Sequence, residues 1–319
     1  MVHPRPSRPV AEVGLPRELA TRVLQHPYAQ RVFARAATVR RTDLVLVYHR
    51  VGDRRDLGVV PQVHPALFRR HITAATRLGD IVPLRELIDR PPTGGRARIA
   101  LTFDDDYASH VDVVLPLLRD AGITATFFLS GRRLNGLGRY WWEVLEALWG
   151  DSPAAVARLV NLPPGSLATL MEACERDPSR QRSLEAQDRV EPDHVDGDGI
   201  RALVKAGMTV GFHTLRHHVM PLLDDTGLAR ALTEGRAVLE EVVGTTIDLF
   251  AYPHGRADAR VAAATRAAGF AAAFTGVGDA VAPHRNSHML SRWEPGAAPA
   301  EQMLAKAAYR LLRRARGGR

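Results

Sequence analysis

The sequence predicts an α/β fold in which parallel strands close into a barrel, and two observations support this. Short apolar or β-branched runs alternate with helical segments along most of the chain. Repeated strand–helix–strand units favour a parallel sheet, and here they are numerous enough for closure. Polar residues collect where the predicted strands end, which is where barrels of this class carry their chemistry.

The individual elements follow from the spacing of apolar residues. We expect strands at 44–51, 97–106, 124–131, 208–214, 248–255, 270–276 and 288–294. We expect helices at 64–79, 111–122, 224–244 and 259–269, the second ending at Gly122. The stretch from about 132 to 195 breaks this alternation, since it is polar and contains proline, and it resembles a helical insertion.

These elements divide the chain into three parts. Residues 1–41 have apolar spacing near 3.6, interrupted at Pro27, and are expected to form a helical extension. Residues 42–298 form the barrel, with the insertion inside it. Residues 299–319 are expected to form a basic helix or tail.

Composition is typical of a soluble globular protein. Hydrophobic residues make up 45% and charged residues 24% of the 319 residues. No apolar run approaches the roughly 18 to 20 residues needed to span a bilayer, and the first residues lack the order of a secretory signal. Cys174 is the one cysteine, which excludes an internal disulfide and fits a reducing compartment. We therefore expect a cytoplasmic protein.

The net charge of +8 is concentrated near the two ends. The basic clusters are Arg31, Arg35, Arg40 and Arg41, and Arg310, Arg313, Arg314, Arg316 and Arg319. No aromatic residues interleave with the second cluster as a base-stacking platform would require, so we expect no nucleic-acid partner. Basic ends suit an anionic membrane surface or a phosphorylated glycan carrier. The alternative is that these arginines only increase solubility.

Two groups of polar residues follow apolar strands and carry the chemical argument. The strand at 97–106 ends in Asp104, Asp105 and Asp106, and adjacent carboxylates require a cation or solvent. His213 and His217 follow the strand at 208–214, four residues apart. Two imidazoles and one carboxylate form a three-ligand site with open positions, the usual arrangement for catalytic zinc. If both strands belong to one barrel, these side chains converge at its mouth, and a second carboxylate is left as general base.

Three motifs give the chain a resemblance to a known family. TFDDDY at 102–107 resembles the first signature of the polysaccharide deacetylase (NodB-homology) family, HTLRH at 213–217 its second, and FAYPHG at 250–255 its third. Their order and spacing agree, and the resemblance covers about residues 42–295. It implies a distorted (β/α) barrel of the NodB type.

The resemblance also implies roles for individual residues. It makes Asp104 the catalytic base. It also implies that the cofactor is a metal ion, most often zinc, with cobalt, nickel or manganese as alternatives. It assigns Asp105, His213 and His217 to the metal. It assigns Thr214 to the support of the histidine loop and the backbone N–H of Tyr107 to the oxyanion. Tyr252 and Pro253 are assigned to the groove beside the sugar.

The general acid and the partner of the base are assigned by a closer resemblance, to the poly-N-acetylglucosamine deacetylase branch. LVLVYHRV fits that branch, so His49 is expected to protonate the leaving amine, with His288 as the second candidate. Asp106 replaces the usual glycine, and aspartate tolerates positive φ if that position requires it. The third signature lacks its usual arginine, and Arg292 is expected to contact Asp104 instead.

The expected activity is hydrolysis of the N-acetyl group of an amino sugar in a glycan, a glycolipid or a glycosylated small molecule. The same site could cleave a non-sugar amide or an acetyl ester. The chain could also be an inactive carbohydrate-binding barrel, or a basic protein that binds membranes or nucleic acid. Trp141, Trp142 and Trp149 begin the insertion. We expect at least two of them to belong to its core, although aromatic rings also stack on sugars.

Overall fold

The fold is known from a computed structural model, which describes residues 43–53, 60–90, 95–163, 165–188, 192–276 and 286–314. The expected helical extension at 1–41, with the first basic cluster, lies outside these residues. So do Arg316 and Arg319 of the second cluster.

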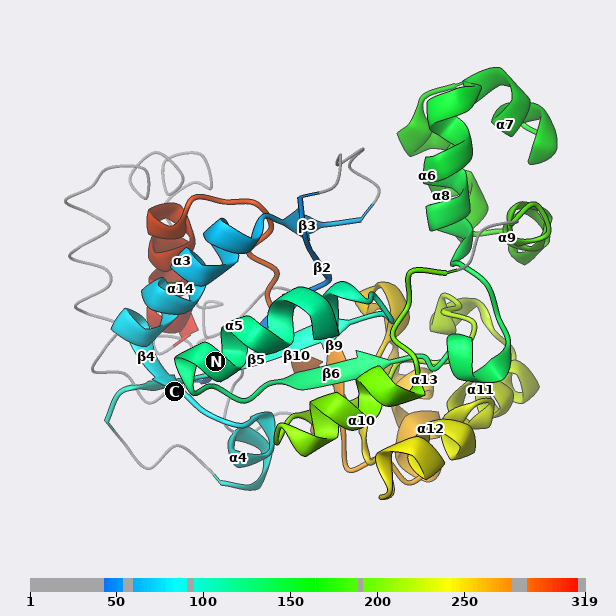
Figure 1. The fold of residues 1–319 in the computed structure, drawn as a ribbon. Coiled ribbons are helices and arrows are strands. Elements are labelled where there is room, and N and C mark those ends of the chain that lie inside the picture. Colours follow the sequence, from blue (N-terminus) through cyan, green and yellow to red (C-terminus); the bar gives the residue numbers. More distant parts are fainter. Residues whose placement is uncertain are drawn as a thin grey trace, which may run out of the picture.

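A parallel sheet forms a nearly closed barrel, as predicted (Figure 1). The strands are β1 (Asp43–Tyr48), β4 (Gly79–Ile81), β5 (Ala97–Asp104), β6 (Thr126–Leu129), β7 (Thr209–Phe212), β8 (Leu249–Ala251), β9 (Ala272–Thr275) and β10 (Leu290–Ser291). Their order is β1-β5-β6-β7-β8-β9-β10, and β4 pairs with β5. Trp293, just after β10, bridges to Leu46 in β1 and so brings the last strand back to the first. A separate two-stranded sheet joins β2 (Arg50–Val51) to β3 (Gln62–Val63).

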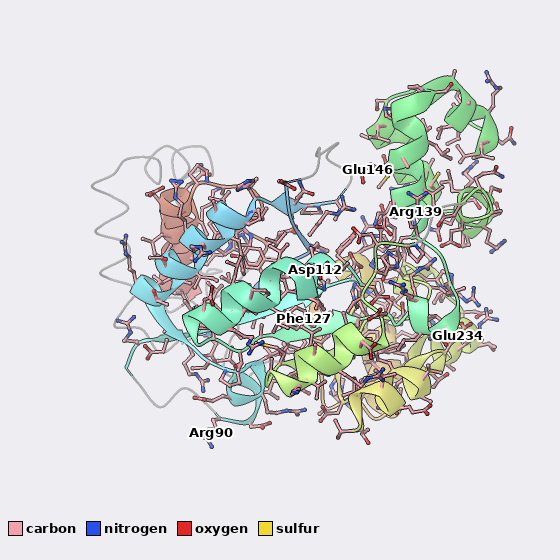
Figure 2. The ribbon with its side chains drawn as sticks, viewed as in Figure 1. Arg90, Asp112, Phe127, Arg139, Glu146 and Glu234 are labelled. Carbon is pink, nitrogen blue, oxygen red and sulfur yellow. The ribbon has the colours of Figure 1, made fainter. Side chains whose placement is uncertain are left out.

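The central strands are buried on both faces. All six residues of β1 and nearly all of β5 are buried, as expected for parallel strands between a packed interior and covering helices. Phe127, near the centre of the molecule (Figure 2), stacks on Phe103 with ring centroids 4.9 Å apart. This packing holds the carboxyl end of β5, where the acidic residues begin.

Helices follow most strands. They are α3 (Pro65–Leu78), α4 (Leu84–Asp89), a π-helical turn (His110–Val114) leading into α5 (Leu115–Ala121), α10 (Gly197–Lys205), α11 (Asp225–Thr233), α12 (Arg236–Val243) and α13 (Ala259–Ala267). The prediction of one helix over 224–244 is wrong, because the helix is interrupted at Gly235, which has a φ of 79°. Glycine adopts this left-handed conformation without the steric cost of a Cβ.

The described part of the insertion contains four α-helices, which share a small core of their own. They are α6 (Trp141–Asp151), α7 (Pro153–Leu159), α8 (Leu167–Glu175) and α9 (Pro178–Glu185). This group stands out from the barrel in Figure 1. Arg139, at its base in Figure 2, binds Asp188 and so ties the entering segment to the leaving one. Trp141 and Trp142 are 2% and 5% exposed, so both belong to this core as expected.

The last helix of the described residues is α14 (Ala300–Arg314), which packs against α3. The Arg310 guanidinium lies over the ring of Trp293, 4.3 Å from its centroid. Among the described residues, no helix combines the length and apolar character needed to cross a membrane.

Candidate active site

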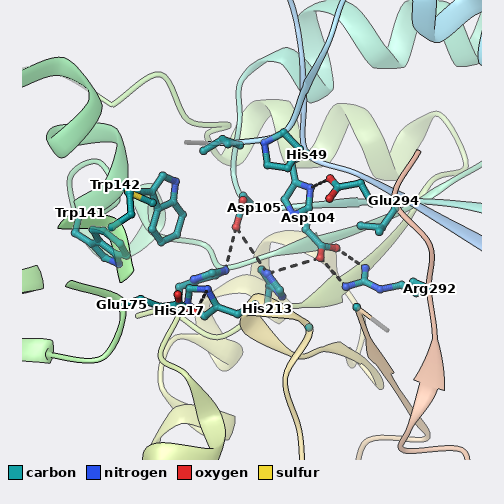
Figure 3. Close-up of a pocket in the computed structure, with 17 residues that line it drawn as sticks. His49, Asp104, Asp105, Trp141, Trp142, Glu175, His213, His217, Arg292 and Glu294 are labelled. Carbon is teal, nitrogen blue, oxygen red and sulfur yellow. Dashed lines mark hydrogen bonds and ion pairs between the residues drawn. The ribbon is translucent and has the colours of Figure 1, made fainter. Parts of the chain in front are cut away.

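A cavity of about 280 Å³ opens at the carboxyl ends of the strands (Figure 3). Its walls include the predicted residues His49, Asp104, Asp105, His213, His217 and Arg292. Residues far apart in the sequence thus meet at the barrel mouth, because the carboxyl ends of parallel strands point to the same side.

Asp104 and Arg292 form a buried bidentate ion pair. Both Nη–Oδ distances are 2.6 Å, and the two residues are 3% and 1% exposed. Burial alone would raise the pKa of Asp104, but the positive charge of Arg292 and the nearby His213 lower it to about 2. The carboxylate is therefore ionised and held in one orientation by the planar guanidinium.

Asp105, His213 and His217 converge in front of this pair. Asp105 Oδ1 lies 3.7 Å from Nε2 of His213 and 3.5 Å from Nε2 of His217. Asp105 has a φ of 70°, a left-handed conformation that aspartate tolerates. Its Oδ1 is buried without a hydrogen-bond partner among the described residues. A buried carboxylate oxygen without a donor is costly, and burial raises the pKa of Asp105 to about 7. A bound cation would satisfy this oxygen and keep the carboxyl group ionised.

The two histidines present the chemistry that a metal requires. Nδ1 of His213 donates to the carbonyl of Ala251 at 2.8 Å, which leaves Nε2 free to act as a ligand. Burial lowers the pKa of both His213 and His217, so both rings are neutral. One ligand atom from each of the three residues lies within 4.8 Å of the others. The set fits a divalent metal of the zinc type.

The backbone between the histidines is held in an unusual conformation. Thr214 and His217 have φ values of 58° and 53°. Oγ1 of Thr214 accepts a hydrogen bond from the His217 N–H at 3.1 Å. The ring of His217 packs between Trp142 and His254, with centroids 4.6 Å from each. Thr214 thus closes the turn that brings the two imidazoles together.

His49 lies on the opposite side of the cavity and is paired with Glu294. Nδ1 of His49 is 2.9 Å from Oε1 of Glu294. Burial lowers the pKa of His49, but the hydrogen bond and negative charge of Glu294, with the charges of Asp105 and Asp104, raise it to about 9. His49 is therefore protonated at neutral pH. The carbonyl of His49 also lies 3.1 Å from Nε2 of His110.

His288, the second candidate for the acid, lies elsewhere. Its Nε2 is 2.8 Å from the carbonyl of Phe270 and its Nδ1 is 3.0 Å from the hydroxyl of Ser287. It is 4% exposed and does not line the cavity. His288 therefore joins two segments of the barrel wall.

Asp106 is buried and binds backbone N–H groups, a role that the sequence alone does not reveal. It is 1% exposed, and its carboxylate accepts hydrogen bonds from the N–H groups of Ser130, Gly131 and Arg132 at 2.8, 3.3 and 2.8 Å. The positive φ falls at Asp105 rather than at Asp106. A side chain at 106 thus connects the ends of β5 and β6.

Tyr252 and Pro253 of the third signature lie behind the cavity wall. Tyr252 is fully buried, and its hydroxyl donates to the carbonyl of His288 at 2.8 Å. Pro253 is also buried, and neither residue lines the cavity. The chain turns after β8 and presents His254 and Gly255 to the cavity, and a contact of Tyr252 or Pro253 with the sugar stays a prediction.

Tyr107 is not among the residues that line this cavity. Its side chain is 3% exposed, lies under the guanidinium of Arg50 and accepts a hydrogen bond from Nε1 of Trp142 at 3.2 Å. Among the hydrogen bonds of the described residues, none uses the backbone N–H of Tyr107. Its role toward the oxyanion stays a prediction.

Sequence reasoning missed Glu294, His254 and Glu175, which all line the cavity. Glu294 had a signal, since residues two apart on a strand share a face and Arg292 was already a candidate. His254 was part of a recognised motif. Glu175 comes from the insertion, and no pattern in the sequence connects it with the barrel.

Comparison with known protein families gave one match. The family model described as "Polysaccharide deacetylase" matches residues 92–273. Comparison with curated proteins gave no match.

Solved structures with a similar fold include three deacetylases. A Streptococcus pyogenes deacetylase, PplD, in complex with acetate has a TM-score of 0.59 and 14% identity, covering 83% of this chain and 98% of its own. IcaB from Ammonifex degensii has a TM-score of 0.57 and 19% identity, and the match covers 84% of this chain and 97% of IcaB. A de-N-acetylase from Aggregatibacter actinomycetemcomitans has a TM-score of 0.53 and 16% identity, and the match covers 79% of this chain and 94% of the de-N-acetylase.

Proposed function

Because the chain belongs to the polysaccharide deacetylase family, we propose that it is a metal-dependent hydrolase that removes the N-acetyl group of an amino sugar. One observation supports this most strongly. A carboxylate paired with arginine, a three-ligand Asp–His–His set and a protonated histidine all face one cavity. Hydrolysis of an amide requires a base, an acid and an electrophile arranged in this way.

Asp105, His213 and His217 would hold the metal. A divalent ion supplies Lewis acidity there, which polarises the acetyl carbonyl and makes water a stronger nucleophile. The preference of two imidazoles and one carboxylate is for zinc, with cobalt, nickel and manganese as alternatives.

Asp104 would accept the proton of the attacking water. Its pKa of about 2 makes it a weak base in the resting site, but also keeps it ionised at every working pH. Arg292 holds both of its oxygens, so the carboxylate cannot rotate away. General base catalysis of this kind typically contributes about 10²- to 10⁴-fold in rate.

His49 would donate the proton that the departing nitrogen needs. Glu294 keeps the ring protonated and orients it through Nδ1, so Nε2 carries the proton to be transferred. The backbone N–H of Tyr107 would donate to the oxygen on which negative charge develops.

The test is acetate release by the purified protein supplied with zinc, cobalt, nickel or manganese. Substrates are N-acetylglucosamine and its β-linked oligomers, an N-acetylated non-sugar amine, and an acetylated xylose as an ester. We expect acetate from the amino sugars. Release from the ester or the non-sugar amide alone would overturn the proposal in favour of a different hydrolase.

Two variants link this activity to the site. Asp104→Ala should lose nearly all turnover, because the base is removed while the metal ligands remain. Asp120→Ala is the matched control, since its exposed carboxylate lies at the end of α5, away from the cavity. Full activity in Asp104→Ala would refute the assignment of the base.

A further inference from the structure

The proposed general acid, His49, lies in a gap between two strands. β1 ends at Tyr48 and β2 begins at Arg50. The ring of His49 is held by Glu294, whose Oε1 is 2.9 Å from Nδ1. Among the described residues, however, no backbone N–H donates to the carbonyl of His49. The sheet hydrogen bonds that hold its neighbours therefore do not fix the peptide group that follows the acid.

A second histidine, His110, supplies the missing contact. Its Nε2 lies 3.1 Å from the carbonyl oxygen of His49. Burial lowers the pKa of His110 to about 4, so its ring is neutral and carries one N–H. Because a carbonyl oxygen can only accept, this N–H is on Nε2 and donates to His49. The other ring nitrogen, Nδ1, is buried and has no hydrogen-bond partner among the described residues.

Stability does not account for a histidine at position 110. The residue is 0% exposed. Its ring packs against three aromatic rings, those of Phe127, Phe103 and Tyr107, with centroids 5.3, 5.7 and 6.1 Å away. An apolar side chain would suit these surroundings without the cost of a buried, unpartnered nitrogen. What the imidazole adds here is the donor to the His49 carbonyl.

The backbone that carries His110 is itself unusual. His110 begins the π-helical turn His110–Val114, in which the N–H of Leu115 donates to the carbonyl of His110. Single turns of this kind are rare and are frequent at functional sites. This turn follows β5, whose carboxyl end carries Asp104. The hydrogen bond from His110 to His49 therefore joins the segment after the proposed base to the segment that carries the proposed acid.

We propose, on the basis of the proposed function, that His110 is a positioning residue for the general acid. Its Nε2–H holds the backbone of His49 so that the ring reaches both Glu294 and the departing nitrogen. His110 does not line the cavity, so it acts through His49 and not on the sugar. Without this contact the acid is displaced from the reacting bond, and a displacement of about 1 Å can lower the rate about 10²-fold.

Variants at position 110 separate the donor from the packing of the ring. His110→Phe removes the donor and keeps an aromatic ring, and His110→Leu does the same with a smaller side chain. In the metal-loaded, folded variants, kcat for acetate release from N-acetylglucosamine and its β-linked oligomers should fall roughly 10- to 100-fold. KM, metal content and the urea midpoint of unfolding should stay close to wild type. His110→Gln should recover most of kcat, because its amide nitrogen is as many bonds from Cα as Nε2 of histidine and can donate to the same carbonyl.

The matched control is His71→Phe. His71 is also 0% exposed, and its Nε2 is 2.7 Å from the carbonyl of Ala298, but it does not line the cavity. This variant should keep the wild-type kcat.

Four outcomes would overturn the inference but not the proposed function. They are a wild-type kcat in the apolar variants at 110, an equal loss of kcat in His110→Gln, an equal loss in His71→Phe, and failure of both apolar variants to fold. Absence of acetate release from every amino sugar by the wild type would overturn both.

Discussion

Replacing Asp106 with alanine should destabilise the protein severely, although the residue is not expected to touch the substrate. Its carboxylate is the acceptor for three buried backbone N–H groups, on Ser130, Gly131 and Arg132. A buried donor left without a partner costs about 1–3 kcal/mol. Because water can enter the space left by the side chain and satisfy part of the set, we expect a loss of about 3–5 kcal/mol in the free energy of unfolding.

Urea unfolding followed by circular dichroism measures this loss. Asp106→Asn retains one acceptor oxygen and should recover about half of it. Asp196→Ala is the control, because the exposed Asp196 caps α10 through one N–H, that of Gly199, and a lost cap costs about 1 kcal/mol. A loss in Asp106→Ala no larger than that of the control would refute the reasoning.

Three further variants probe the site. Glu294→Gln removes the carboxylate that raises the pKa of His49 to about 9. Because the acid must be protonated, activity falls as pH rises through the pKa of His49. The variant should lower that pKa, so the alkaline limb of the kcat profile should move to lower pH. An unmoved limb would exclude His49 as the titrating acid. Arg292→Lys keeps the charge but cannot hold both oxygens of Asp104, so kcat should fall about 10²-fold, and an unchanged kcat would show that the orientation of the base is unimportant. Tyr252→Phe loses one hydrogen bond, to the carbonyl of His288, and should lower the free energy of unfolding by about 1 kcal/mol with kcat/KM unchanged. A loss of kcat/KM without a loss of stability would show that Tyr252 contacts the substrate.

The sequence was most informative where function and local structure coincide. Asp104, Asp105 and the histidines stand directly after apolar strands, and in a parallel barrel the ends of such strands meet. Knowing the strands was therefore enough to predict that these residues share a cavity. Arg292 was expected because the resemblance implies an arginine beside the catalytic aspartate and the third motif lacks one.

Other features depend on tertiary packing and had no local signal. Nothing in the sequence of α8 indicates that Glu175 reaches Arg256 on the barrel, because this contact depends on how the insertion is oriented. Tyr252 follows a strand, as His213 does, yet its ring turns inward to the carbonyl of His288. Periodicity also predicted one helix through Gly235, since apolar spacing continues across the break.

The metal content of the purified protein tests the central claim most directly. Mass spectrometry of the wild type and of the double variant His213→Ala, His217→Ala would be carried out after incubation with zinc and removal of the excess. We predict about one ion per chain in the wild type and none in the double variant, since Asp105 alone leaves too few ligands. Equal metal content in the two proteins, or none in either after incubation with zinc, cobalt, nickel and manganese, would contradict the proposed metal site and the hydrolysis that depends on it.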